Sequence, residues 1–430
     1  MDPKPSVAII GSGPAALFAA WALRSSGHEV TVFEQHDHLT LARQASASEG
    51  TPRVDIPMRT FSGAYYANLF RVLNHLGIAT RVHRFHYRFL QGMAEYFQFF
   101  SNFHRIIPCL SNSFWINLYV LACYVWYTMA VFVVPPRIKN GSSGSEETET
   151  LDQYAKRIRL PDRFLDWYLL PLFASVATCS HGDLRQCPAA YIADYRRRTF
   201  AAHHRTVSDM HVLQTLLTRN VTIVLQAKVE RVQPGIEGVE IHFTTGDGDK
   251  HQIRIFDRAI IATSAKQAGE LFPTIRSITS RLSEGRVRIS VTESSHRANA
   301  GRSETLVLMT QVEDTSSPVT HAIHHHPSGL DVVVSPGFHD AEKGPAGAEL
   351  IYLNRPLPTS ESHDLLYEVF GTASKGRKLG WKNGDYGIYL AGGYASASLP
   401  LLEACVRSAL EAAVAIGADL PFEIVKHTSF

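Results

Sequence analysis

The stretch VAIIGSGPAALFAAWALRSSGHEVTVFE, residues 7–34, joins a strand pattern, a glycine turn, a helix pattern and a second strand pattern. Its first four residues are apolar and mostly β-branched, which is typical of a strand buried on both faces. The Ala- and Leu-rich segment 15–24 favours a helix, and the serines and glycine after it favour a helix end. This order of elements predicts the start of a parallel α/β fold.

The turn GSGPAA at residues 11–16 has the glycine spacing of a dinucleotide-binding loop. Gly11 permits a tight turn, Gly13 lets a pyrophosphate approach the backbone, and the small Ala16 lets the helix pack closely on the strand. The amides and positive dipole end of that helix would then face the phosphates. Glu34 ends the second strand about 20 residues later, where a carboxylate can bind ribose hydroxyls and disfavours a 2′-phosphate.

The composition of the 430-residue chain indicates a globular protein of about two domains. A formal net charge of +2 gives no field that would favour nucleic acid, so no nucleic-acid partner is expected. The five cysteines are odd in number and widely spread, which predicts neither a disulfide framework nor a metal site. We see no signal-peptide pattern and expect an intracellular protein, cytoplasmic or peripherally membrane-associated.

Residues 7–34, with Pro14 and Ala15 after the second glycine, resemble the FAD-binding opening of the flavin-containing amine oxidase and phytoene desaturase superfamily. Four later segments extend the resemblance: KVERV at 228–232, FDRAIIAT at 256–263, GIYLAGGY at 387–394 and LLEACVRSALEAA at 401–413. The resemblance implies FAD as cofactor and a set of cofactor contacts, namely Gly11, Gly13, Pro14, Ala15, Ala16, Glu34, Gln35, Arg43, Met58, Arg59, Val229, Thr263, Gly392 and Leu402.

The matching segments are scattered, so we expect a discontinuous FAD-binding domain made of residues 1–60, 205–265 and 380–430. The remaining segments, 61–204 and 266–379, would form an inserted substrate domain. The predicted fold class is α/β: a Rossmann-type, glutathione-reductase-like FAD-binding domain with an inserted α+β substrate domain.

Two features of the predicted substrate domain can be read from residue patterns. Alternating apolar runs between residues 287 and 336 predict an antiparallel sheet. The segment 137–150, which is Gly/Ser-rich and acidic from residue 140, predicts an exposed loop.

The stretch SFWINLYVLACYVWYTMAVFVV, residues 113–134, has no Asp, Glu, Lys or Arg, and as a helix would reach roughly 30 Å, the thickness of a hydrocarbon core. A full crossing would divide the expected cofactor site between two sides of a bilayer, so we exclude it. Asn117, Tyr124 and Thr128 form a mildly polar stripe. Two interpretations remain: a helix buried in the substrate domain, or a hydrophobic hairpin that makes one-leaflet membrane contact.

Three further patterns are weaker. The histidines at 324–326 resemble metal ligands, but no spaced Cys, Asp or Glu accompanies them, so we predict a solvated hairpin and no metal. The arginines at 196–198 predict a solvated helix face rather than a site for an acidic substrate. Arg59 can either fix a substrate carboxylate or brace its own loop. No residue is assigned to catalysis.

The leading hypothesis is an FAD-dependent oxidoreductase (an oxidase, dehydrogenase or desaturase) that takes a hydride from a lipophilic small molecule, for example in secondary metabolism. O2 or another electron acceptor would complete the cycle. One alternative is a redox-neutral double-bond isomerase, because PAAY at 188–191 resembles part of a flavin-dependent fatty-acid isomerase. The other alternative is a membrane-attached FAD-binding protein without turnover.

Overall fold

The computed structural model describes residues 4–45, 54–55, 60–92, 94–100, 114–137, 148–200, 202–207, 209–246, 250–294, 305–311, 317–326, 328–337, 348–370 and 380–426. Two of the predicted cofactor contacts, Met58 and Arg59, lie outside these residues. Most of the predicted loop at 137–150 also lies outside them.

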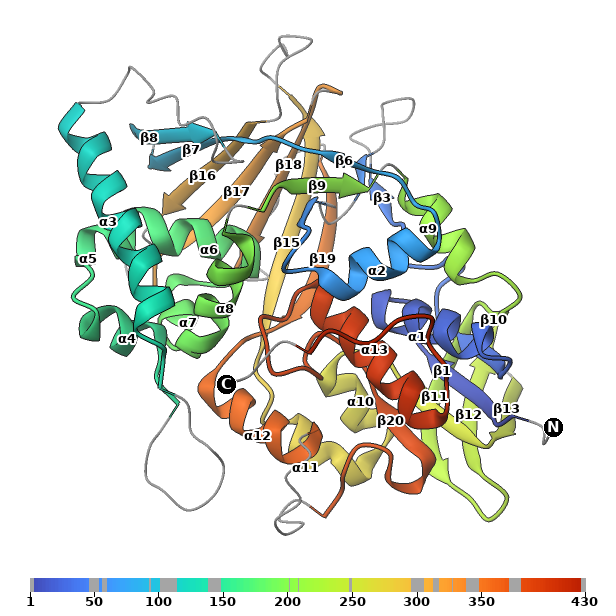
Figure 1. Cartoon of the computed structure of the whole chain (residues 1–430). Helices are drawn as coiled ribbons and strands as arrows, with labels where there is room; N and C mark the ends of the chain where they lie inside the picture. The colour runs from blue at the N-terminus through green and yellow to red at the C-terminus, as the bar shows by residue number, and fades with distance from the viewer. Residues whose placement is uncertain are drawn as a thin grey trace.

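A five-stranded sheet holds the two strands predicted within residues 7–34 (Figure 1). Its order is β10-β2-β1-β14-β20, and every neighbouring pair is parallel. The strands are β1 (Ser6–Ile10), β2 (Glu29–Phe33), β10 (Thr222–Val224), β14 (Arg258–Ile261) and β20 (Ile388–Leu390). They come from three distant parts of the chain, and this topology confirms the predicted α/β class with a Rossmann-type sheet.

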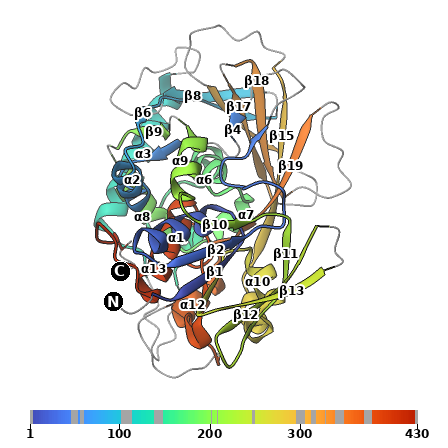
Figure 2. The ribbon, with the colours of Figure 1, turned by 90° about the vertical axis from the view of Figure 1, so that its right-hand side faces the viewer.

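Different elements cover the two faces of this sheet (Figure 2). On one face lie α1 (Pro14–Ser25), α9 (Met210–Leu217) and α13 (Leu402–Ile416). On the other lie β11 (Ala227–Pro234), β12 (Val239–Thr245), β13 (Lys250–Phe256), α10 (Ala265–Leu271), η2 (Pro273–Ile275), α11 (Arg276–Thr279) and α12 (Ser360–Phe370).

Strand β1 belongs to both hydrophobic clusters at once. Val7 and Ile9 pack with α1 and α13, whereas Ala8 and Ile10 pack with β11, β12 and α10. Successive side chains of a strand point to opposite faces. The apolar run at the start of the chain is therefore continuous rather than alternating because both faces are covered.

A seven-stranded sheet forms the core of the rest of the molecule, in the order β19-β15-β18-β17-β16-β7-β8. Its strands are β7 (His86–Gln91), β8 (Ala94–Phe100), β15 (Glu284–Glu293), β16 (Thr305–Gln311), β17 (Val319–His325), β18 (Leu330–Pro336) and β19 (Glu349–Pro356). The pairs among β15 to β19 are antiparallel, as predicted for residues 287–336. The exception in this sheet is the parallel pair of β16 and β7.

A group of helices lies beside this sheet, at the left of Figure 1. They are α3 (Phe114–Val133), α4 (Leu151–Arg157), α5 (Asp162–Phe164), a π-helical turn η1 (Leu165–Leu169), α6 (Leu170–Ala177), α7 (His181–Arg185) and α8 (Ala189–Thr199). The remaining elements are short or peripheral: β3 (Gln44–Ala45), β4 (Val54–Asp55), β5 (Thr60–Ser62), α2 (Ala67–His75), β6 (Thr80–Val82), β9 (His204–Val207) and η3 (Asp385–Gly387).

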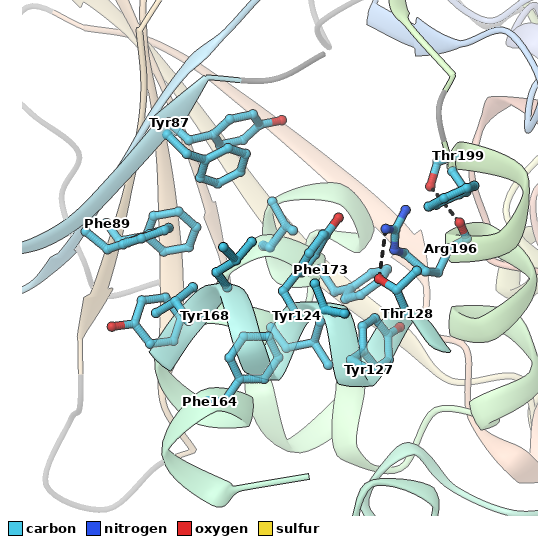
Figure 3. A pocket seen from close by; sticks show the side chains of 18 of the residues that line it. Tyr87, Phe89, Tyr124, Tyr127, Thr128, Phe164, Tyr168, Phe173, Arg196 and Thr199 are labelled. Carbon is cyan, nitrogen blue, oxygen red and sulfur yellow. Dashed lines mark hydrogen bonds between the residues drawn. The ribbon is translucent and has the colours of Figure 1, made fainter. Parts of the chain in front are cut away.

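Helix α3 is packed along one side and exposed along the other. Tyr127 and Val131 are buried, and Tyr124, Tyr127 and Thr128 lie toward the neighbouring helices (Figure 3). Trp115 and Val133, by contrast, are 72% and 73% exposed. Among the described residues, α3 is the helix long and apolar enough to cross a membrane, although only 28% of its most apolar window is buried. The protein therefore does not enclose this helix on all sides.

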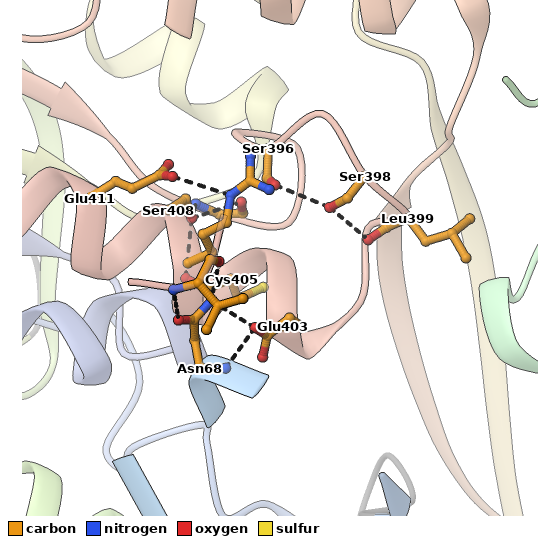
Figure 4. Close-up of polar contacts among 11 residues, drawn as sticks. Asn68, Ser396, Ser398, Leu399, Glu403, Cys405, Ser408 and Glu411 are labelled. Atoms are coloured by element: carbon orange, nitrogen blue, oxygen red, sulfur yellow. Dashed lines mark hydrogen bonds and ion pairs between the residues drawn. The ribbon is translucent and has the colours of Figure 1, made fainter. Parts of the chain in front are cut away.

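A buried carboxylate connects α2 with α13. Glu403, which is 1% exposed, accepts hydrogen bonds from the backbone and side-chain amides of Asn68 through Oε1, at 2.9 and 2.8 Å (Figure 4). Its Oε2 accepts a hydrogen bond from the backbone amide of Leu69 at 3.1 Å. These amides belong to the first turn of α2, which lacks intrahelical acceptors. One side chain from α13 therefore caps a helix that lies far away in the sequence.

Replacing Glu403 by Gln should destabilise the protein. A Gln side chain presents an N–H group to one of the backbone donors, so buried groups lose a partner, at an expected loss of about 1–3 kcal/mol of unfolding free energy. Chemical denaturation followed by circular dichroism measures the loss. Glu361→Gln is the matched control, since Glu361 is 62% exposed in an ion pair with Arg281. Equal stabilities of the two variants would contradict the capping role.

Candidate functional site

The glycine turn follows β1 in a conformation that suits glycine. Gly11 has φ +101°, and a Cβ atom there would lie 3.0 Å from the carbonyl oxygen of Ala262. A side chain at this position would therefore meet both backbone strain and a close contact. The same hypothetical Cβ would lie 3.7 Å from the methyl group of Thr263, so the structure brings these two predicted residues together at the ends of β1 and β14.

The second glycine adjoins open space. Gly13 precedes α1 in extended backbone, and a Cβ added to it would meet no atom within 4 Å. Pro14 occupies the first turn of α1, where its missing N–H group is no loss. Ala15 and Ala16 are buried residues of the first turn of α1. A helix N-terminus with unpaired amides beside open space has the form of an anion-binding site.

Glu34 lies directly beyond β2 and is held rigidly. It is 5% exposed, accepts a hydrogen bond from the hydroxyl of Ser12 at 2.6 Å, and accepts another from the amide of His36 at 2.9 Å. Ser12 in turn accepts a hydrogen bond from the amide of Thr40 at 3.0 Å. A carboxylate offers about four acceptor positions, so Glu34 keeps capacity for ribose hydroxyl groups.

The other predicted contacts are placed as follows. Val229 is buried beside a bulge in the pairing of β11 with β12. Gly392 follows β20, and its amide donates to the hydroxyl of Ser408 at 3.0 Å. Leu402 is the first residue of α13, while Gln35 is exposed and Arg43 is half-buried. Glu34, Thr263 and Gly392 all lie beyond the carboxyl ends of parallel strands, where such sheets bind ligands. Their role in binding stays a prediction.

A second feature is a cavity of about 770 Å³ lined by residues of α3, η1, α6, α8, β7 and β8 (Figure 3). Most of its wall is aromatic or aliphatic. The aromatic residues that line it are Tyr87, Phe89, Phe97, Phe99, Phe114, Tyr124, Tyr127, Phe164, Tyr168, Phe173, Tyr195 and Phe200. A volume in this range is usual for sites that enclose a small organic ligand. We refer to this cavity as the aromatic pocket.

The titratable side chains of the aromatic pocket are mostly neutral at pH 7. Burial raises the pKa of Tyr168 to about 12, and it also raises the pKa values of Tyr127 and Tyr195. Burial lowers the pKa of His204 to about 4, because the charged imidazolium is poorly solvated there. Most of the wall is therefore of low polarity.

Two of the three consecutive arginines of α8, Arg196 and Arg197, contact α3, so the prediction of a solvated helix face is wrong for these two. Arg196 lines the aromatic pocket and donates a hydrogen bond from Nη2 to the hydroxyl of Thr128 at 2.9 Å. Arg197 donates from Nε to the carbonyl of Val131 at 2.8 Å, and Arg198 pairs with Asp194 at 2.9 Å. The first two arginines dock α8 on α3, which their spacing in the sequence did not reveal.

The histidines at 324–326 are also less exposed to solvent than predicted. His324 is 8% exposed in β17, and Nδ1 of His325 lies 2.7 Å from the carboxylate of Asp331. The prediction of a solvated hairpin is therefore wrong for His324. Within the part of the chain that the structure describes, no group of three or more His, Cys, Asp or Glu side chains is arranged to hold a metal ion.

Comparison with known proteins supports the architecture. A family model described as an NAD(P)-binding Rossmann-like domain matches residues 9–76. No curated protein sequence matches the chain. Among solved structures, the CLA-producing fatty acid isomerase from P. acnes is 13% identical, with a TM-score of 0.60, over 95% of this chain and 98% of the isomerase.

Two amine oxidases have similar structures. Cyclohexylamine oxidase from Brevibacterium oxydans IH-35A is 14% identical, with a TM-score of 0.58, over 96% of this chain and 99% of the oxidase. A triple mutant of putrescine oxidase is 14% identical, with a TM-score of 0.59, over 96% and 98% of the two chains. At such low identity the likeness concerns the fold. The chain therefore contains a Rossmann-like domain and has the overall fold of this fatty acid isomerase and these two amine oxidases.

Proposed function

We propose that the protein is an FAD-dependent oxidoreductase that removes a hydride from a lipophilic small molecule. The observation that carries this proposal is the aromatic pocket, which occurs in the same fold as a nucleotide-binding glycine turn. An apolar cavity with a few polar groups is the usual form of an enzyme's binding site. Amine oxidases of the same fold make oxidation the favoured reaction.

The residues of the glycine turn fit FAD. Open space beside Gly13 and the N-terminus of α1 would receive the pyrophosphate, and Glu34 would receive the ribose hydroxyls. Leu402 begins α13, whose N-terminal dipole would favour negative charge on a nearby ring. When bound, FAD supplies an acceptor for a hydride, which carries two electrons.

The aromatic pocket would contribute orientation and dryness rather than acid–base catalysis. The phenols of Tyr127 and Tyr195 stay protonated because burial raises their pKa values, so they can donate hydrogen bonds but are poor bases. Neutral His204 adds no charge to the wall. Such a lining binds an extended apolar molecule through its surface and keeps water away from the reacting carbon.

A redox-neutral isomerase is the second candidate. The observation that favours it is the likeness to a fatty acid isomerase over 95% of this chain. The same pocket would then hold an unsaturated substrate while a double bond moves. The two candidates need the same cofactor and differ in whether electrons leave the substrate.

We also propose that the exposed side of α3 contacts one leaflet of a membrane. Leu118, Val125 and Met129 are more than 40% exposed, yet they also line the aromatic pocket. The exposed apolar surface is thus continuous with the wall of the aromatic pocket. An exposed apolar surface of this kind can be a site of membrane contact. A lipophilic substrate would then pass from the lipid to the pocket without crossing water.

Gly13→Ala should reduce FAD retention and destabilise the apoprotein by no more than about 1 kcal/mol, the cost of Ala relative to Gly at an N-cap. The reason is that the added methyl group meets no protein atom but occupies the space proposed for the pyrophosphate. Flavin absorbance per protein and the melting temperature of the apoprotein are measured together. Gly11→Ala is the contrasting variant, expected to lower both because of its positive φ and the close Ala262 carbonyl. Normal FAD content in Gly13→Ala would refute this placement.

Anaerobic mixing of the FAD-loaded protein with lipophilic amines, polyenes and fatty acids separates the candidate reactions. Net oxidation predicts lasting loss of flavin absorbance at about one equivalent of substrate, because no acceptor returns the electrons. Isomerisation predicts product without lasting loss. Neither response with any compound would support a binding protein without turnover. Folded protein without flavin absorbance and without affinity for FAD would refute the proposed function.

The membrane contact predicts that the protein sediments with phosphatidylcholine vesicles. The double variant Trp115→Glu, Val133→Glu should lose most of this binding, because two charges would have to enter the lipid interface. Neither side chain lines the aromatic pocket. Ile236→Glu, at a fully exposed apolar residue between β11 and β12, is the control and should bind vesicles normally. Wild-type protein that stays in the supernatant would contradict the proposal.

A further inference from the structure

The aromatic pocket contains one fixed charge. Arg196 is the only residue of the Asp, Glu, Lys and Arg types among the described residues that line it. Its guanidinium lies at one side of the pocket, next to Thr128 (Figure 3). It also lies over the rings of Tyr124 and Phe200, with the central carbon 4.8 and 5.3 Å from their centroids. These contacts fix the position of the guanidinium but supply no negative charge.

Two buried donors of the pocket lack a hydrogen-bond partner. Nε of Arg196 makes no hydrogen bond within the described structure, and neither does the hydroxyl of Tyr127. Both side chains line the aromatic pocket, and both lie on the Thr128 side of it (Figure 3). Buried donors normally have an acceptor, and an unpaired buried donor costs more when it belongs to a charged group than to a neutral one. Each donor therefore lacks an acceptor, and a single negatively charged acceptor could serve both.

The side chains of the two neighbouring arginines have acceptors within the protein. Arg198 has the carboxylate of Asp194, and Arg197 has the carbonyl of Val131. The three residues follow one another on α8 and so point in different directions. Of the three, only Arg196 lines the pocket. Since an arginine fork matches the geometry of a carboxylate, a bound carboxylate would satisfy Nε–H and the hydroxyl of Tyr127 together.

We propose that the aromatic pocket binds an apolar carboxylate, with its headgroup on Arg196 and Tyr127 and its hydrocarbon part along the aromatic walls. This inference names the substrate class of the site in the proposed function and rests on it for the reaction. It also separates this chain from oxidases that take amines. A protonated amine in the same pocket would meet the positive charge of Arg196 in surroundings of low polarity, where repulsion is strong.

Calorimetric titration of the FAD-loaded protein with decanoate, 1-decanol and decylamine tests this preference at pH 7.5. The three probes share one chain and differ in charge. Decanoate should bind at least about tenfold more tightly than the alcohol, as a charge-assisted hydrogen bond in a dry site allows, and the amine should bind most weakly. Equal affinities for the three probes, or tightest binding of the amine, would overturn the proposal.

Variants separate recognition of the anion from packing. Arg196→Gln should lower the affinity for decanoate about tenfold or more and leave that for 1-decanol within about twofold, whereas Arg196→Lys should keep part of the preference. Tyr127→Phe removes one donor without removing the ring and should weaken decanoate binding several-fold. Arg198→Gln is the matched control and should change neither affinity. Equal losses for decanoate and 1-decanol in Arg196→Gln would instead mean that Arg196 only holds α8 against α3.

Binding and turnover can fail separately. A carboxylate preference that persists while no compound reduces the flavin or is converted would leave this inference standing and refute the proposed oxidoreductase. Turnover of amines or neutral polyenes, without any preference for decanoate, would support the oxidoreductase and refute the role of Arg196.

Discussion

The parallel register of β1 with β2 and β14 is the constraint on which the molecule depends. It places Ile10, Phe33 and Ile261 side by side at one edge of the sheet, so the residues that follow them share one region. This register brings Gly11, Glu34 and Thr263 to the same end of the sheet. Because β1 is covered on both faces, slipping by one residue would exchange the side chains of two hydrophobic clusters. The hydrophobic packing on the two faces of the sheet thus fixes the position of its carboxyl end.

The local part of the candidate site could be predicted because its signals lie within one short stretch of sequence. Gly11 and Gly13 obey steric rules that hold for any such turn, and Glu34 follows from the length of one strand–helix–strand unit. The aromatic pocket could not be predicted in this way. Phe89 and Phe97 meet Tyr168 only after β7 pairs in parallel with β16, more than 200 residues later in the chain. Alternating aromatic residues between 85 and 100 were the signal, but alternation alone predicts only a strand.

The solvent exposure of the arginines of α8 was predicted wrongly for a related reason. A run of arginines is usually solvated, yet α8 packs against α3, and the backbone carbonyl of Val131 and the hydroxyl of Thr128 replace water around two of the three. The partners come from an apolar helix, which offers no charged residue to a search for ion pairs. The polar stripe of Asn117, Tyr124 and Thr128 was therefore the better guide, since it marks the side of α3 that lies against the protein. The rule that a run of arginines is solvated assumes that water surrounds the side chains, and the packing of α8 on α3 replaces that water with protein groups.

The cap that Glu403 provides to α2 has a consequence for biosynthesis. Glu403 and Asn68 are separated by 335 residues. At ribosomal rates of roughly 5–20 residues per second, that interval corresponds to tens of seconds during which the first turn of α2 has no partner. Strand β20 and α13 also emerge late, so the nascent protein must hold an incomplete sheet with an open edge during this time. Until β20 pairs with β14, that strand presents unpaired backbone groups, and an open strand edge can pair with another chain.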